Sequence, residues 1–133
     1  NIPEMTKQLT VYLSDLHFEH NQWSNELKFW EDEIKTFTKR LEEVVKRYTS
    51  NEIRAKIEHF QNQFVLHDQV IDILKKDVKK HEKIIADQAS HETVAIDHVH
   101  FEDHKSVRDR MDTQRKIYSD LKTEYSEFLT KTM

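Results

Sequence analysis

The chain has 133 residues, of which 35% are charged and 36% hydrophobic, and its formal net charge is -4. It contains no Gly, no Cys and one Pro. The length suits a single domain over residues 1–133. The absence of Gly argues against sheet folds and phosphate-binding loops, which use Gly for tight turns and close backbone approach. The acidic balance argues against a nucleic-acid partner, and no run of about 20 apolar residues is present that would cross a membrane.

The first predicted helix covers about residues 3–48. From Leu9 to Tyr48, apolar residues recur in alternating steps of three and four, a spacing that places them on one face of a long helix. The polar cluster after Tyr48 has the spacing of a capping box, with Thr49 as the N-cap and Glu52 three residues later. The sequence therefore predicts a tight reversal at this cluster.

Two further helices are expected, over about residues 51–88 and 91–132. Both continue the alternating steps of three and four, and the apolar stripe is interrupted by His67, His81 and His104. Near-equal helix lengths and short connections favour antiparallel neighbours. We expect an all-α fold, an elongated antiparallel up-down-up three-helix bundle with heptad-type packing. The alternative is a helix pair whose third helix docks in a dimer.

Histidines at core positions are the main candidates for chemistry. If the chain reverses near Ser50 and near Ser90, His20 comes within one turn of both His81 and His104. Imidazoles and carboxylates bind transition ions, so this layer predicts a zinc or iron site. The candidate ligands are His17, His20, His81, Asp97, His100 and His104.

Two other interpretations of these histidines remain open. Each core histidine can be neutral and hydrogen-bonded, fixing register only, as we expect for His67 with Gln114 as its partner. Alternatively the layer is a pH switch, in which protonation below about pH 6.5 places charge in the core and loosens the bundle. In addition, Ser90-His91-Glu92 is similar to the start of the phosphoacceptor box of histidine kinases, although the Pro of that box is absent. This similarity implies a signalling bundle with a phosphoaccepting His91.

Several apolar residues fall outside the predicted core stripe. They are Phe18 and Phe29 in the first helix and Leu66 and Ile73 in the second, the last three at similar heights along the hairpin. Outward apolar residues on a helical bundle favour a partner helix or a dimer. We therefore expect an interaction surface that includes these four positions.

The expected function is a non-enzymatic structural or interaction module that associates with itself or with a protein partner. The chain has no Gly-x-Ser-x-Gly motif and no Cys, so no nucleophilic catalysis is expected. No cofactor is expected except the zinc or iron ion of the alternative interpretation. We expect a cytoplasmic location, or a secreted one if a leader ahead of Asn1 has been removed.

Overall fold

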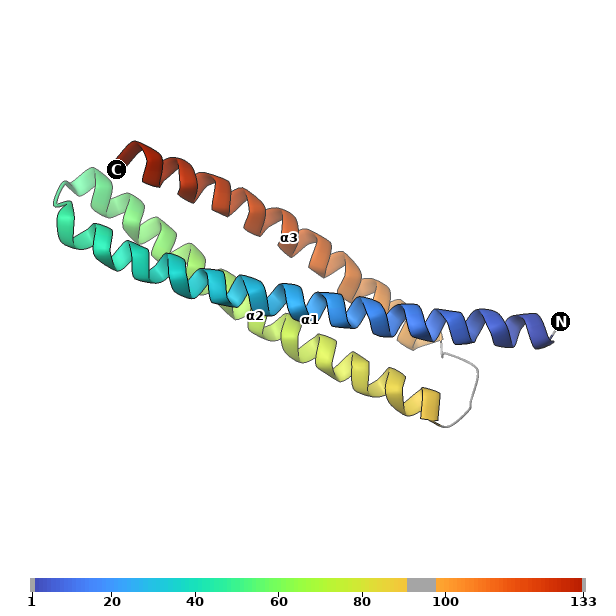
Figure 1. Ribbon diagram of the computed structural model, residues 1–133. Coiled ribbons are helices and arrows are strands. Elements are labelled where there is room, and N and C mark those ends of the chain that lie inside the picture. Colours follow the sequence, from blue (N-terminus) through green and yellow to red (C-terminus); the bar gives the residue numbers. More distant parts are fainter. Residues whose placement is uncertain (1, 91–97, 133) are drawn as a thin grey trace. The chain divides into compact units, whose positions relative to one another are not determined.

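The structure is a computed structural model that describes the backbone of residues 2–90 and 98–132, and the side chains of residues 14–87 and 102–132. It contains three helices, α1 (Ile2–Arg47), α2 (Asn51–Ser90) and α3 (His98–Thr132), and no strand within the described residues (Figure 1). The all-α, three-helix prediction is confirmed. The bounds of α1 and α2 agree with the predicted ones within two residues. The predicted start of the third helix, at residue 91, lies outside the described residues.

The connection between α1 and α2 is short and begins α2 with a serine cap. The last helical hydrogen bond of α1 runs from the Tyr48 amide to the Val44 carbonyl. The Ser50 hydroxyl then accepts a hydrogen bond from the Ile53 amide at 3.3 Å, as an N-cap side chain does. The predicted N-cap, Thr49, is therefore wrong by one residue. Since the third helical position is then Ile53, no side chain there can complete a capping box.

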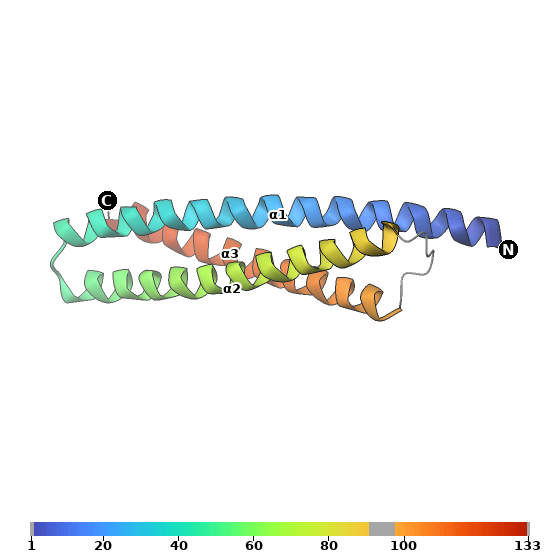
Figure 2. The ribbon, with the colours of Figure 1, turned by 90° about the horizontal axis from the view of Figure 1, so that it is seen from below.

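Contacts divide the chain into two compact units, and each helix contributes to both. Unit 1 comprises Asn1–Leu27 and Ile73–Met111, and unit 2 comprises Lys28–Asp72 and Asp112–Met133. Figure 2 shows a segment of all three helices in each range, following the colour bar. The prediction that the chain forms one domain stays a prediction.

Unit 2 has a core rich in aromatic residues. Phe60 and Phe64 from α2 meet Tyr125 from α3 with ring centroids 5.3 and 5.1 Å apart. The Phe37 ring of α1 lies 5.1 Å from the ring of the same tyrosine in a tilted arrangement, and the Tyr125 hydroxyl donates to the Phe37 carbonyl. Aromatic pairs at these distances add to the stabilisation from apolar burial. The fully packed rings therefore hold segments of all three helices together in this unit.

Within the described side chains, burial follows the predicted stripe. From Leu16 to Val44 every stripe residue of α1 is buried except Phe37, which is half-buried. In α2 and α3 the stripe is buried throughout residues 57–85 and 104–128. The polar members of this stripe, which sequence alone places in the core, are His20, His67, His81, His104 and Gln114.

Candidate functional site

Three buried histidines share the core of unit 1. His20 comes from α1, His81 from α2 and His104 from α3, and their side chains are at most 8% exposed. The ring centroids of His20 and His104 are 4.9 Å apart, and those of His20 and His81 are 6.1 Å apart. The surrounding core of unit 1 is apolar and consists of Leu16, Trp23, Leu27, Leu74, Val78, Ile85, Val107 and Met111.

Two of these histidines lie in the middle of a hydrogen-bonded row that crosses the three helices. His20 Nε2 and His104 Nδ1 are 3.0 Å apart. The other nitrogen of each ring meets a carboxylate, His20 Nδ1 at 2.8 Å from Glu82 Oε2 and His104 Nε2 at 2.7 Å from Glu19 Oε1. We call the row Glu82–His20–His104–Glu19 the histidine chain. Because the imidazoles are buried and the carboxylates are only part-buried, the histidine chain runs from the core of unit 1 to its partly exposed surface.

An arginine closes one end of the histidine chain. Arg108, four residues after His104 on α3, donates from Nε and Nη2 to the two oxygens of Glu19 at 2.8 and 2.7 Å. Burial raises the pKa of Glu19, but hydrogen bonds from Arg108 and His104 outweigh it, so the net pKa lies below the ordinary value. Glu19 is therefore a carboxylate at neutral pH and accepts a hydrogen bond from His104.

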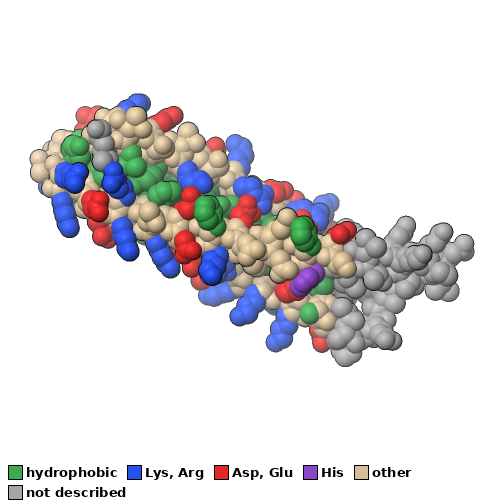
Figure 3. All heavy atoms as spheres, viewed as in Figure 1, with side chains coloured by type: hydrophobic (Ala, Val, Ile, Leu, Met, Phe, Trp, Pro, Cys, Tyr) green, Lys and Arg blue, Asp and Glu red, His purple; other side chains and the backbone are tan. Residues whose placement is uncertain are grey.

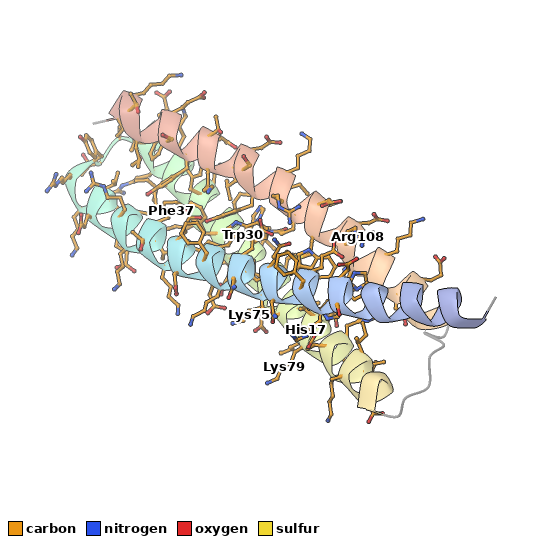
Figure 4. All side chains as sticks on the ribbon, turned by 45° about the vertical axis from the view of Figure 1, so that its right-hand side comes forward. His17, Trp30, Phe37, Lys75, Lys79 and Arg108 are labelled. Atoms are coloured by element: carbon orange, nitrogen blue, oxygen red, sulfur yellow. The ribbon has the colours of Figure 1, made fainter. Side chains whose placement is uncertain are left out.

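The other end of the histidine chain carries a third imidazole. His17 Nδ1 bonds to the second oxygen of Glu82, and His17 Nε2 accepts from the Asn21 amide at 3.3 Å. Figure 4 shows His17 on one side of α1 and Arg108 on the other, which matches their contacts with α2 and α3.

A tryptophan ring covers the two central imidazoles. Trp23 stacks on His104 with ring centroids 5.0 Å apart and lies 5.5 Å from His20. Trp23, which the sequence marks only as a core residue, therefore packs against both imidazoles of this layer.

The polar layer of unit 2 is simpler. The Gln114 side-chain amide donates to His67 Nδ1 at 2.8 Å, as the sequence predicts for this pair. Burial lowers the pKa of His67. His67 is thus a neutral core histidine whose hydrogen-bond partner is a neutral amide, in contrast to the carboxylates of the histidine chain.

The predicted metal ligands fall into two groups. The structure brings His17, His20, His81 and His104 into unit 1, where the nitrogens of His20 and His104 bond to protein partners. Asp97 and the side chain of His100 lie outside the described residues. Among the side chains that the structure describes, no group of three or more His, Asp or Glu residues is placed to hold a metal ion. None of these residues is assigned here as a metal ligand, and the zinc or iron site stays a prediction.

The four apolar residues expected to face outward are exposed. Phe18, Phe29, Leu66 and Ile73 are all more than half exposed. One turn after Phe29, Glu33 of α1 accepts a hydrogen bond from Lys122 of α3 at 3.2 Å. Phe29 therefore lies toward the Lys122 flank of α3.

Leu66 lies toward the other flank of the same helix. His59, seven residues before Leu66 and so on the same side of α2, bonds to Glu124 of α3 at 2.9 Å. Lys122 and Glu124 are two residues apart, so they point about 200° apart around the α3 axis. The structure thus places Phe29 and Leu66 on different flanks of α3 and not in one patch.

Sequence reasoning missed the two carboxylates of the histidine chain and the arginine that bonds to one of them. Glu19 and Glu82 each adjoin a core histidine in sequence, and Arg108 is four residues after His104. A charged residue next to a core position, or one turn away from it, can reach a core imidazole. This spacing is the feature of the sequence that could have identified Glu19, Glu82 and Arg108.

Comparison of the chain with protein-family models, with curated proteins and with solved structures finds no match. In the part of the chain that the structure describes, none of the helices has an apolar stretch suited to crossing a membrane. His91 of the phosphoacceptor interpretation lies outside the described residues.

Proposed function

We propose that the chain is a non-enzymatic helical module that binds protein through its helix faces, and that its packing responds to pH through the histidine chain. The observation that carries this proposal is the buried hydrogen bond between His20 and His104, flanked on both sides by carboxylates. Histidine is the side chain whose charge changes between pH 5 and 8 without any special environment. A bond made of two imidazoles therefore depends directly on pH.

The expected response to acid follows from the number of donors. When both His20 and His104 are doubly protonated, each presents an N–H at the central contact, and neither nitrogen can accept. Burial lowers the pKa of His104, and the charge of nearby His20 and Arg108 lowers it further against the opposing effect of Glu19. The second proton is therefore taken up below about pH 6.5, and its uptake breaks the contact between α1 and α3 in unit 1.

Tryptophan fluorescence tests this response locally. In a Trp30→Phe variant, Trp23 is the only indole and reports on His104, which it stacks on. In the matched Trp23→Phe variant, Trp30 reports on unit 2, where it packs against Tyr118. We expect the Trp23 emission to change as the pH falls below about 6.5, at a higher pH than the Trp30 emission. A Trp23 signal that is flat between pH 8 and 5, or that changes only together with Trp30, contradicts the proposal.

Self-association is a second candidate function, favoured by one exposed surface of unit 2. His59 and Glu124 are hydrogen-bonded to each other. Leu66 lies seven residues after His59, and Ile117 lies seven residues before Glu124. We therefore expect Leu66 and Ile117 to lie side by side in the same way. Both side chains are about half exposed, and Val70 is a further exposed apolar residue on this side of α2. A two-fold axis through such a strip would bury it against the same strip of a second copy. On the face shown in Figure 3, Lys and Arg side chains are interspersed with Asp and Glu, and hydrophobic side chains are visible between them.

Sedimentation equilibrium over a range of protein concentrations tests whether two copies of the chain associate. We expect the mass to rise toward that of a dimer in the native chain, and to stay at that of one chain in Leu66→Gln and Ile117→Gln. The control is Val45→Gln, which changes an exposed apolar residue elsewhere in unit 2 and should leave the mass unchanged. A native chain that remains monomeric at high concentration, or a loss of dimer in Val45→Gln, contradicts this candidate.

A further inference from the structure

The three hydrogen bonds of the histidine chain require one more proton than two neutral imidazoles and two carboxylates would supply. Three hydrogen bonds join Glu82, His20, His104 and Glu19 in a row, and each bond needs one proton between its two atoms. A carboxylate brings none, and a neutral imidazole brings one. With two neutral imidazoles, one of the three contacts would place two lone pairs against each other.

With two neutral imidazoles, the contact that lacks a proton would be the central one, between His20 and His104. Glu19 is a carboxylate, so His104 Nε2 donates to it, and His20 Nδ1 donates to the Glu82 carboxylate in the same way. If both rings were neutral, His20 Nε2 and His104 Nδ1 would then both be bare at a separation of 3.0 Å. A proton between these two nitrogens turns that repulsion into a hydrogen bond.

We propose that the buried pair His20–His104 is a binding site for one excess proton at neutral pH, held in the hydrogen bond between the two rings. This inference rests on the proposed function, because it specifies the state from which the pH response starts. The proton makes the pair one imidazolium, His20, whose Nε2–H donates to a neutral His104. The step is a proton transfer in which a bond to hydrogen breaks in hydronium or a buffer acid, one N–H bond forms on the imidazole pair, and the conjugate base stays in solvent.

Charge compensation supports this assignment. Facing the pair are Glu19 and His17 from α1, Glu82 and His81 from α2, and Arg108 from α3. The two carboxylates carry two negative charges, and Arg108 supplies one positive charge. The excess proton supplies the second positive charge, so the cluster of acids, arginine and imidazole pair is neutral overall. Without that proton, the cluster around the two buried imidazoles would carry an uncompensated negative charge, which is less favourable where the groups are partly removed from water.

The asymmetry of the two carboxylates places the proton on the His20 side. Glu19 is already compensated by the bidentate Arg108, whereas among the described side chains Glu82 is hydrogen-bonded by the imidazoles of His17 and His20. An imidazolium is stabilised most beside the carboxylate that lacks a cation. Burial and the charge on His20 both lower the pKa of His104, in agreement with a neutral His104.

Counting protonated ring nitrogens by NMR tests the proposal. In the native chain with ¹⁵N-labelled histidine, long-range ¹H–¹⁵N spectra at pH 7 distinguish protonated from bare nitrogens, and His20→Gln and His104→Gln variants assign the rings. We expect three of the four nitrogens of His20 and His104 to carry a proton. Two protonated nitrogens, one on each ring, or four, would overturn the proposal.

A charge variant provides the second measurement and works on a folded chain. Glu82→Gln keeps the size and the acceptor oxygen but removes the negative charge next to His20. We expect the third nitrogen to lose its proton at a lower pH than in the native chain, whereas the matched control Glu58→Gln, an exposed position on the same helix, leaves this pH unchanged. If the third nitrogen loses its proton at the same pH in the native and Glu82→Gln chains, the assignment of the charge is wrong.

The two proposals fail in different ways. If the native pair has only two protonated nitrogens while Trp23 still responds to acid, the excess proton is wrong and the pH response stands. If the pair has three protonated nitrogens and Trp23 does not respond, the proton is bound but does not control packing.

Discussion

At the scale of single residues, the environment of each core histidine decides what it can do. His104 and His67 are both buried, and burial lowers the pKa of both. His67 bonds to the neutral Gln114, whereas His104 bonds to Glu19 and to a second imidazole. The same residue type at the same kind of core position is therefore bonded to a neutral amide in unit 2 and to a carboxylate and a second imidazole in unit 1.

Arg108 should contribute more to stability than an exposed arginine on the same helix. Arg108→Gln removes two charge-assisted hydrogen bonds from part-buried Glu19, and we expect a loss of about 1–2 kcal/mol in the free energy of unfolding at pH 7.5. Arg115→Gln, which breaks an exposed pair with Asp112, should cost about 0.5 kcal/mol or less. Urea denaturation of the two variants measures the difference. Equal losses would show that Arg108 does not support the histidine chain.

The hydrogen bond between His67 and Gln114 should be detectable as a coupling energy. Gln114→Leu leaves His67 Nδ1 buried without its donor, at an expected cost of about 1–3 kcal/mol. The double variant His67→Leu with Gln114→Leu should cost less than the two single losses added together. A double-mutant cycle in urea gives this value, and strict additivity would mean that the two side chains do not interact.

Sequence was informative about the positions of these residues and less so about their partners. Helix spacing alone placed His20, His81 and His104 in the core and His67 beside Gln114. It missed Glu82 and Arg108, because a side chain that reaches the core from a flanking position leaves no trace in the apolar stripe. The direction in which a long charged side chain turns depends on the neighbouring helix, so it is visible only in the structure.

At the scale of elements, helix ends depend on single hydrogen bonds in a chain without Gly. The sequence offered Thr49 and Ser50 as adjacent candidates for the N-cap of α2, and spacing to Glu52 favoured the wrong one. The structure selects Ser50, because its hydroxyl is the one that meets the Ile53 amide. Where two capping patterns overlap in sequence, the backbone geometry decides which residue is the N-cap, and composition does not.

Replacing each hydroxyl in turn tests the cap. Ser50→Ala removes an acceptor from the first turn of α2, and we expect a loss of about 1 kcal/mol in the free energy of unfolding. Thr49→Ala should be close to neutral. The two variants are compared by urea denaturation monitored by circular dichroism at 222 nm. A larger loss of unfolding free energy for Thr49→Ala than for Ser50→Ala would mean that Thr49 is the N-cap, as the sequence favoured.

At the scale of the whole molecule, both units contain a buried histidine with a lowered pKa. In the unfolded chain such a histidine takes up a proton near its ordinary value of 6.5, whereas in the folded chain it does so only at lower pH. The unfolded state therefore binds more protons in this window, and stability is lost as the pH falls below about 6.5. The lowered pKa of Glu19 also makes the folded chain less stable in acid. Its contribution to the free energy of unfolding is lost as the pH falls below the ordinary pKa of 4.5.

The most direct test of a pH response controlled by the histidine chain is the free energy of unfolding between pH 8 and 5, measured in urea for the native chain, His104→Gln and His59→Gln. The native chain should lose stability below about pH 6.5. His104→Gln, which removes the titrating ring, should lose less over the same range, whereas His59→Gln, which removes an exposed histidine, should follow the native curve. Parallel curves for the native chain and His104→Gln would show that acid acts elsewhere, and would contradict the account.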